Sequence, residues 1–245
     1  MSVTSGSLPT RRATRPCPYC GRLLKAVTVK GAGDAWMFCG FERCGCEGER
    51  EAEEAERERE RRHEAEALRR SRIRAGVPRR YADAVHPDAR GYAERIARGR
   101  ALFVIGPVGT GKTYLVSAVC RELQAMGKRF RMLSSVQLLE RYRACYDGDG
   151  SELSVTGALV NVPVLMIDDL GKEAPTDWAV ERLFRVVDER YNRELPTVVT
   201  TQFERPALIK RLSRGGDAEN AVALISRLYE TCDTVRTDGA DRRLG

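Results

Sequence analysis

The chain has 245 residues, of which 42% are hydrophobic and 31% are charged. This size and balance allow one α/β domain with a hydrophobic core and a small appended module. No apolar run approaches the roughly 20 residues that a membrane-spanning helix needs, and no apolar stretch follows the N-terminal arginines, so we expect a cytoplasmic protein with no membrane partner. The formal net charge of +7 is compatible with a polyanionic partner such as nucleic acid, without requiring one.

The first part of the chain carries a polar tail and a cysteine cluster. Residues 1–15 are rich in Ser, Thr, Gly and Arg, which predicts a disordered tail. The segment 16–46 contains five of the eight cysteines, namely Cys17, Cys20, Cys39, Cys44 and Cys46. In a chain without a secretion signal, such clustering indicates a metal site rather than disulfides.

The cysteine spacing predicts zinc. Two residues separate Cys17 from Cys20, so both thiolates can reach one ion at about 2.3 Å. The second pair stays open on spacing alone, because Cys39 with Cys44 fits as well as Cys44 with Cys46. A module with so few apolar residues needs the metal in order to fold.

A charged segment, residues 47–75, separates this module from the rest. It consists mostly of Glu, Arg and Ala, which favour helix, and pairs such as Glu58 with Arg62 stand four residues apart in the favourable order. No apolar stripe is present, so we expect an exposed linker helix and not a coiled coil. Gly76 and Pro78 end this helix.

Residues 76–245 alternate between strand and helix patterns. The predicted strands are 101–105, 129–135, 162–167, 196–201 and 232–237. The predicted helices are 113–126, 136–146, 177–192, one beginning at 206 and one around 218–230. This alternation predicts an α/β domain in which helices cover both faces of a parallel sheet.

A phosphate-binding loop follows the first of these strands. The sequence GPVGTGKT satisfies the pattern G-x-x-x-x-G-K-[ST] between a predicted strand and a predicted helix. In this setting Lys112 reaches the β and γ phosphates of ATP, and the hydroxyl of Thr113 binds Mg²⁺. The predicted nucleotide-binding residues are Gly106, Pro107, Val108, Gly109, Thr110, Gly111, Lys112, Thr113 and Tyr114. A chance glycine-rich turn is the alternative, and two further elements argue against it.

Two other strands end in polar side chains. The apolar run VLMI ends in Asp168, which is expected to hold Mg²⁺, and in Asp169, which is expected to orient or deprotonate the attacking water. A plain strand-end turn is the alternative, since Asp is common there. The strand 196–201 also ends in polar residues, which makes Thr201 or Gln202 a candidate sensor of the γ-phosphate unless this strand end is only structural.

These motifs together carry a family resemblance. GPVGTGKT, MIDDLGKE, ERYNRELPTVVTTQF, ISRLYE and DGADRR resemble AAA+ ATPases of the DnaC/DnaI type, the replicative helicase loaders of bacteria and phages. The resemblance extends upstream through CPYC, CGCE and GVPRRYADA. It implies a P-loop AAA+ ATPase domain over 76–245 that assembles with its own kind, a zinc module that docks on a replicative helicase, and single-stranded DNA as a further partner. The host would be bacterial and the gene could belong to a phage.

The resemblance also implies roles for particular residues. Cys44 and Cys46 would complete the zinc site. Arg227 would be an arginine finger that completes the active site of a neighbouring subunit, the alternative being a surface arginine of an amphipathic helix. Arg242 or Arg243 would sense the nucleotide.

The expected contact with single-stranded DNA follows the second strand of the domain. Positive charges and stacking rings suit this ligand, and tyrosines that pack on the core are the alternative. The candidate residues are Arg141, Tyr142, Arg143 and Tyr146.

One departure and two rivals accompany this interpretation. Gln202 stands where the family usually has Asn, which leaves the rate of hydrolysis open. A transposition helper of the IstB type shares the ATPase core and would bind duplex DNA and a transposase. A zinc-bearing adaptor that binds nucleotide with little turnover is the rival from another class.

Overall fold

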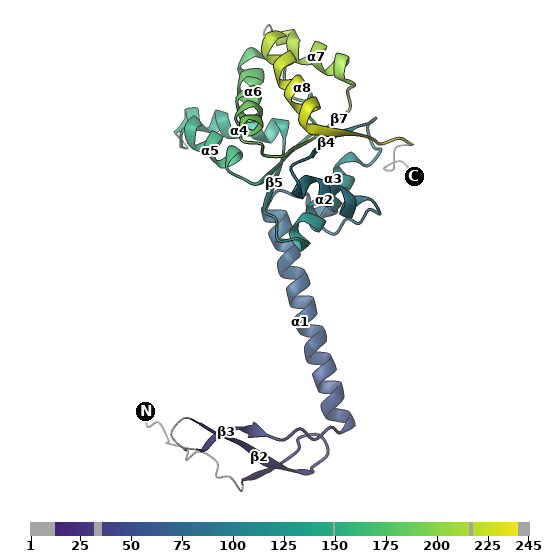
Figure 1. Cartoon of the computed structure of the whole chain (residues 1–245), viewed down its shortest axis with the longest axis vertical. Helices are drawn as coiled ribbons and strands as arrows, with labels where there is room; N and C mark the ends of the chain where they lie inside the picture. Colours follow the sequence, from purple (N-terminus) through teal and green to yellow (C-terminus); the bar gives the residue numbers. More distant parts are fainter. Residues whose placement is uncertain (1–12, 32–35, 149, 216–217, 240–245) are drawn as a thin grey trace. The chain divides into compact units, whose positions relative to one another are not determined.

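The computed structural model describes residues 13–31, 36–148, 150–215 and 218–239. The chain forms two compact units, residues 1–67 and 68–245, and each is described by itself with the labels of Figure 1. The predicted disordered tail, 1–15, lies outside the described residues up to residue 12, as do Arg242 and Arg243. The end of this tail is corrected, because Thr14 and Arg15 lie in a strand that pairs with the next one. In the part of the chain that is described, no helix has the length and apolar character needed to cross a membrane.

The first unit contains a small antiparallel sheet and the start of a helix. Its three strands pair in the order β1-β2-β3. They are β1 (Thr14–Pro16), β2 (Leu23–Lys30) and β3 (Trp36–Phe41). Among the described residues of this unit, the only buried apolar side chains are those of Cys17 and Leu24. The sheet therefore has almost no core of its own.

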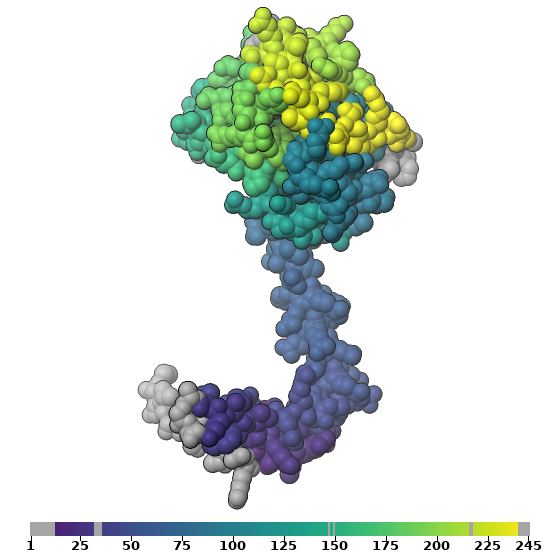
Figure 2. All heavy atoms as spheres, in the orientation of Figure 1, coloured from purple at the N-terminus to yellow at the C-terminus, as the bar shows by residue number. Residues whose placement is uncertain are grey.

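Helix α1 (Glu47–Arg74) begins in this unit. Glu58 forms ion pairs with Arg61 and Arg62 at 2.7 and 2.8 Å, but pairs this exposed stabilise a helix only slightly. The space-filling view of α1 shows the side chains of this stretch at the surface (Figure 2). High helix propensity, rather than packing, explains why the charged stretch is helical.

The last turns of α1 belong to the second unit, and two arginines attach them to it. The side chain of Arg72 is buried and donates to the carbonyl oxygen of Ala82 at 2.7 Å and to Oδ1 of Asp83 at 3.0 Å. Arg69 donates to Oδ2 of the same aspartate at 2.7 Å. These hydrogen bonds hold the helix against the segment that leads into the sheet.

The second unit is built on a five-stranded parallel sheet of order β5-β6-β7-β4-β8. The strands are β4 (Ala101–Ile105), β5 (Phe130–Ser134), β6 (Val164–Asp168), β7 (Thr197–Thr201) and β8 (Cys232–Arg236). Because all five run in the same direction, their carboxyl ends meet along one edge. The segments that follow β4, β6 and β7 are the ones in which the sequence predicts chemistry.

Helices cover both faces of this sheet. They are α2 (Ala89–Ala97), α3 (Lys112–Ala125), α4 (Ser135–Ala144), α5 (Glu152–Val160), α6 (Asp177–Asn192), α7 (Arg205–Leu212) and α8 (Ala218–Thr231). Figure 1 shows α2 and α3 on one side and α6 and α8 on the other. The α/β fold class is thus confirmed, and α2 and α5 are helices that the sequence patterns did not predict.

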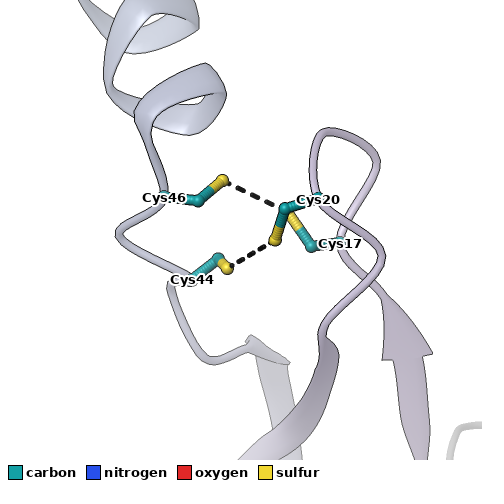
Figure 3. Close-up of side chains that lie close together, drawn as sticks. All are labelled: Cys17, Cys20, Cys44 and Cys46. Atoms are coloured by element: carbon teal, nitrogen blue, oxygen red, sulfur yellow. Dashed lines mark hydrogen bonds between the residues drawn. The ribbon is translucent and has the colours of Figure 1, made fainter.

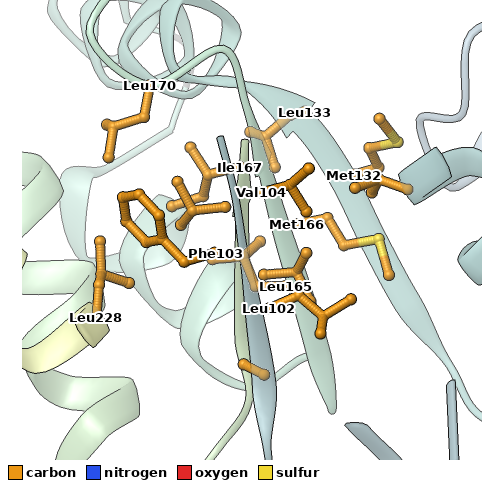
Figure 4. Close-up of a cluster of buried hydrophobic side chains, with 14 of the residues drawn as sticks. Leu102, Phe103, Val104, Met132, Leu133, Leu165, Met166, Ile167, Leu170 and Leu228 are labelled. Atoms are coloured by element: carbon orange, nitrogen blue, oxygen red, sulfur yellow. The ribbon is translucent and has the colours of Figure 1, made fainter. Parts of the chain in front are cut away.

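The core lies between the sheet and its helices. Central strands supply fully buried side chains such as Phe103 and Leu165, and Leu228 of α8 packs on them from one face (Figure 4). The central strands are buried on both faces, which is typical of a parallel sheet covered by helices. This rigid sheet positions the loops at its carboxyl edge.

Candidate functional site

The loop between β4 and α3 has the geometry of a phosphate cradle. A Cβ on Gly106 would overlap the carbonyl oxygen of Thr237, so only glycine fits there. Gly111 has a φ of 94°, a conformation that favours glycine, and leads directly into α3. The first N–H groups of α3 have no partner within the helix and form a site for anions.

A cavity of about 500 Å³ lies beside this loop. Its volume is in the range of pockets that hold small ligands. The loop and the start of α3 contribute the largest group of lining residues, joined by residues that follow β6 and β7 and by two that precede α2. The lining residues are Arg80, Tyr81, Val108, Gly109, Gly111, Lys112, Thr113, Tyr114, Asp169, Lys172 and Gln202.

Lys112 lies inside the loop. Its ammonium donates to the carbonyl oxygens of Gly106 and Pro107, each at 2.7 Å, and the side chain is buried. The hydroxyl of Thr110 also donates to the Pro107 carbonyl, at 2.9 Å. The loop therefore holds the lysine at the N-terminus of α3, the end of a helix at which anions bind.

Asp168 forms a cluster of oxygen atoms with two threonines. The hydroxyl of Thr113 lies 2.9 Å from Oδ2 of Asp168, and the hydroxyl of Thr200 donates to Oδ1 at 2.6 Å. Burial raises the pKa of Asp168, and the neighbouring charge of Asp169 raises it further. Carboxylate and hydroxyl oxygens are the ligands that Mg²⁺ prefers, so this donor set fits the predicted ion.

Asp169 faces the cavity from a constrained backbone. Its φ of 59° is rare for a residue with a side chain, and its N–H donates to the hydroxyl of Thr200 at 2.9 Å. Oδ2 lies 2.6 Å from Nζ of Lys172. Thr200 thus contacts both aspartates. The sequence pattern indicated Thr201 instead, because the sequence alone does not show toward which face of the sheet each threonine side chain points.

The two sensor candidates are placed differently. Gln202 lines the cavity. Thr201 is fully buried, and its hydroxyl donates to the carbonyl oxygen of Leu170 at 2.7 Å. The hydroxyl of Thr201 is therefore engaged by the backbone, and of the two candidates only Gln202 lines the cavity.

An aromatic wall lines another part of the cavity. The rings of Tyr81 and Tyr114 meet edge to face at 5.8 Å, and the guanidinium of Arg80 lies 5.2 Å from the Tyr81 ring centre. The hydroxyl of Tyr114 donates to the carbonyl of Val85 at 3.0 Å. Sequence reasoning predicted Tyr114 but treated the segment before α2 only as a domain start, although its Arg-Arg-Tyr run was a visible signal.

Arg227 is held within its own chain. Its Nε lies 2.6 Å from Oδ1 of Asp188 on α6, and its guanidinium lies 4.9 Å from the ring centre of Phe184. The side chain is 29% exposed, and it is not part of the cavity lining. The predicted arginine finger therefore forms a bridge between α8 and α6 in this structure.

The four residues predicted to contact DNA differ in their exposure to solvent. Tyr142 is fully buried, with its hydroxyl 2.7 Å from that of Thr156, so the prediction that it stacks on a base is corrected: the ring is part of the core. Arg141 and Arg143 are exposed.

A group of aromatic and basic side chains, exposed at Arg143 and Tyr146 and half-buried at Trp178 and Arg182, includes two of these residues. Tyr146 is 64% exposed and accepts a hydrogen bond from Nε1 of Trp178 at 3.0 Å. The guanidinium of Arg143 lies 5.2 Å from the Trp178 ring centre, and that of Arg182 lies 5.1 Å from it. Trp178 comes from α6, far along the chain, so the sequence pattern did not connect it with this group.

Four cysteines of the first unit gather at one point (Figure 3). The sulfur atoms of Cys17, Cys20, Cys44 and Cys46 all lie within 4.8 Å of one another. Cys39 stands apart, and its thiol lies 3.7 Å from the carbonyl oxygen of Met37. The second pair is thus Cys44 with Cys46, the pair that the resemblance implies.

The cluster has the dimensions of a tetrahedral thiolate site. Zn–S bonds of about 2.3 Å place sulfurs roughly 3.8 Å apart, and the sulfur–sulfur distances are 3.8 Å for Cys17 with Cys46 and 3.3 Å for Cys20 with Cys44. Backbone N–H groups of Tyr19 and Cys20 lower the pKa of Cys17 to about 7. The hydrogen bond with the thiol of Cys20 raises the pKa of Cys44 to about 12, so a metal ion, which binds thiolates, would have to displace protons from this cluster.

Comparison with known proteins identifies relatives of this chain. The chain is 26% identical over 151 residues to the replicative helicase loader DnaI of Bacillus subtilis, covering 60% of this chain and 48% of that protein. It is 34% identical over 101 residues to a putative ATP-binding protein of insertion sequence IS1162 from Pseudomonas fluorescens, covering 41% and 43%. The chain spans about half the length of the curated relatives it matches.

Solved structures and a family model agree with these relatives. The crystal structure of the DnaC helicase loader is similar in fold, with a TM-score of 0.56, 24% identity, and coverage of 66% of this chain and all of that one. The resemblance to the DnaC/DnaI type is thereby confirmed. The model for IstB-like ATP binding proteins matches residues 91–245, which is more than half of the sequence. The chain belongs to the family of IstB-like ATP-binding proteins, and its second unit is an AAA+ domain of the kind found in DnaC and DnaI.

Proposed function

We propose that this protein is an ATPase that binds a replicative helicase and places it on single-stranded DNA, with ATP as the switch. One observation carries the ATPase part: Lys112, Asp169 and Gln202 line a single cavity beside the phosphate loop. The relatives named as helicase loaders support the remainder.

The cavity residues have distinct roles in the proposed reaction. Water attacks the γ-phosphorus of ATP, the bond to the bridging oxygen breaks, ADP leaves, and the carboxylate of Asp169 accepts the proton of the water. Lys112 and the N–H groups of α3 bind the β and γ phosphates, while Gln202 orients the water or the γ-phosphate. Held by Thr113 and Asp168, Mg²⁺ would neutralise phosphate charge. The ring of Tyr81 offers the nucleobase an aromatic surface.

Substitution of Lys112 tests the site. We expect Lys112→Ala to lower the rate of ATP hydrolysis by about a hundredfold or more and to weaken ATP binding, because the loop loses the cation aimed at the phosphates. Phosphate release and nucleotide binding should be measured side by side. Lys128→Ala, at an exposed lysine shortly after α3, is the matched control. Hydrolysis at the parental rate in Lys112→Ala would contradict the assignment.

Self-assembly is proposed to complete the active site through Arg227. To reach a neighbouring subunit, this arginine has to leave Asp188, with which it pairs at 2.6 Å. Arg227→Ala should then bind ATP normally and hydrolyse it far more slowly, since the lost contact belongs to the transition state. A mixture with Lys112→Ala should regain partial activity, because one interface keeps both an intact loop and an intact finger.

The alternative role of Arg227 predicts a different pattern. If the arginine only bridges α8 and α6, Arg227→Ala lowers the thermal midpoint while the rate of hydrolysis per folded molecule stays unchanged. A mixture that co-assembles and remains inactive would also exclude the finger.

The first unit is proposed to hold zinc and to contact the helicase. Four thiolates complete the coordination of a structural zinc ion and leave no open position for a reaction, so this site serves folding and docking. Apolar side chains lie exposed on its sheet, among them Leu23, Val29 and Met37. Exposed apolar groups in a small module support an interaction role.

Single-stranded DNA is proposed to contact the exposed group around Trp178. Arg143 and Tyr146 supply positive charge and a ring face there, whereas the buried Tyr142 takes no part. Arg143→Ala and Tyr146→Ala should each weaken binding of an oligonucleotide, and only the arginine change should reduce the dependence of affinity on salt. Equal affinity for all three proteins would exclude this surface.

A transposition helper is the second candidate. The IS1162 relative and the IstB-like family description favour it, and Gln202 favours a third possibility, an adaptor with little turnover. Purification of the protein with its native partners distinguishes the first two: a helicase and preference for single strands support loading, whereas a transposase and preference for duplex DNA support transposition. Binding of ATP without measurable hydrolysis would support the adaptor.

A further inference from the structure

We infer that Lys172 is a positioning residue for ATP hydrolysis, which holds the carboxylate of Asp169 in the cavity; this inference rests on the proposed ATPase function. Nζ of Lys172 lies 2.6 Å from Oδ2 of Asp169. Both side chains line the same cavity as Lys112 and Gln202. Lys172 is thus a cation of this cavity in addition to Lys112 and Arg80, and the phosphate-loop motif does not include it.

The backbone that carries this pair is fixed from several sides. The N–H of Lys172 donates to the carbonyl oxygen of Asp169 at 3.1 Å, which closes a tight turn. At the start of the turn, the Asp169 N–H is bound by Thr200 at 2.9 Å. The side chains of the pair therefore leave the turn from anchored positions.

A buried carboxylate secures the other end of the turn. Glu173 is only 4% exposed, and its two carboxylate oxygens accept from the N–H of Gly171 at 3.1 and 3.0 Å. The hydroxyl of Ser135 donates to the same carboxylate, and Arg211 donates to the Gly171 carbonyl. Such anchoring lowers the entropy cost of holding Lys172 against Asp169, because the backbone is already ordered.

The pair serves the proposed reaction in a defined way. As the water oxygen bonds to the γ-phosphorus and the bond to ADP breaks, the water proton passes to the Asp169 carboxylate, while Lys172 keeps its own protons. The ammonium restricts the carboxylate to one orientation, with an oxygen directed toward the cavity. An ion pair this exposed, 46% for the lysine and 28% for the aspartate, adds little to stability, so its expected effect is on the rate.

Steady-state ATP hydrolysis by the full chain tests the inference. Lys172→Ala should lower kcat by roughly tenfold to a hundredfold, because a base displaced by about 1 Å loses rates of that order, while KM stays within about twofold. Lys172→Arg should restore a substantial part of kcat. Lys210→Ala, at an exposed lysine of α7, should match the parent, and all variants should share its thermal midpoint.

A double-mutant cycle separates positioning from other roles. In an Asp169→Asn background, Lys172→Ala should lower kcat by less than about twofold further, because the group that it positions is already gone. Equal kcat in Lys172→Ala and the parent would overturn the inference, and so would full additivity with Asp169→Asn. If Asp169→Asn itself hydrolyses ATP at the parental rate, the proposed reaction fails first and the role of Lys172 fails with it.

Discussion

The two units of this protein are stabilised in opposite ways. Described residues of the first unit include two buried apolar side chains, Cys17 and Leu24, whereas the second unit buries apolar side chains on every strand of its sheet and on the helices that cover it. The first unit instead gathers four sulfur atoms at one point. A unit this small buries too little surface to offset the entropy of ordering its chain.

The difference shows which interactions stabilise each unit. In the second unit it is distributed over many contacts, so the sheet edge can carry a strained residue such as Asp169 without loss of the fold. In the first unit we expect it to depend on one site, the zinc site proposed at the four gathered cysteines. We therefore expect the loss of a single interaction to have very different consequences in the two units.

Removal of metal should give the largest effect. A strong chelator, or Cys17→Ser combined with Cys20→Ser, should unfold the first unit, since binding of structural zinc contributes on the order of 10 kcal/mol to such modules. ATP binding by the second unit should persist. Elemental analysis of protein purified under reducing conditions measures the zinc, proteolysis measures the folding of each unit, and a nucleotide-binding assay measures the ATP binding that should persist.

Cys39→Ser is the control for this experiment. Its thiol lies outside the cluster, so the variant should retain its zinc and its resistance to protease. If the purified protein contains no zinc, or if the first unit stays folded in chelator, the first unit does not depend on a metal for folding.

A single polar residue should give the next largest effect, within the second unit. Arg190 is fully buried on α6, and burial lowers its pKa to about 10. Among the described residues, no carboxylate accepts a hydrogen bond from it. Its guanidinium donates instead to one hydroxyl and to backbone carbonyls at the ends of α5, β6 and β7. The recorded acceptors are the carbonyls of Leu159, Val160, Val162, Pro163 and Pro196 and the hydroxyl of Thr197.

We expect Arg190→Met to lower the free energy of unfolding of the second unit by about 3–5 kcal/mol, because buried acceptors lose their donor. Denaturant unfolding followed by a signal from this unit measures the loss. Arg185→Met, on the exposed face of the same helix, should change it by less than about 0.5 kcal/mol. Similar losses in the two variants would show that the hydrogen bonds of the buried Arg190 guanidinium do not stabilise the second unit.

Substitution of two valines, one in each unit, should have the smallest effects on stability. Val199 is fully buried in β7, whereas Val29 in β2 is 51% exposed. Val199→Thr should lower the free energy of unfolding by about 1–2 kcal/mol, because a hydroxyl replaces a methyl group of similar size in the core. Val29→Thr should change it by less than about 0.5 kcal/mol. Hydrogen exchange of peptides from each strand measures both. A larger cost at Val29 would reveal a core that the first unit does not show.

Local signals in the sequence were sufficient where the chemistry is local. The phosphate loop, its lysine and the two aspartates at the end of β6 lie in short segments whose conformation depends on neighbouring residues, so Lys112 and Asp169 were predictable and lie in one cavity. Strand and helix patterns predicted the sheet for the same reason. Helices α2 and α5 were missed, because short helices depend more on packing than on their own sequence.

What the sequence by itself determined is the fold class, the family resemblance and the phosphate loop, because periodicity and motif spacing are properties of adjacent residues. Only the tertiary structure decided which polar and aromatic groups meet across long distances along the chain. It excluded Cys39 from the sulfur cluster, buried Tyr142, and brought Thr200 to Asp168. Burial and hydrogen-bond geometry arise when separate elements pack together, and no window of sequence contains both partners of such a contact.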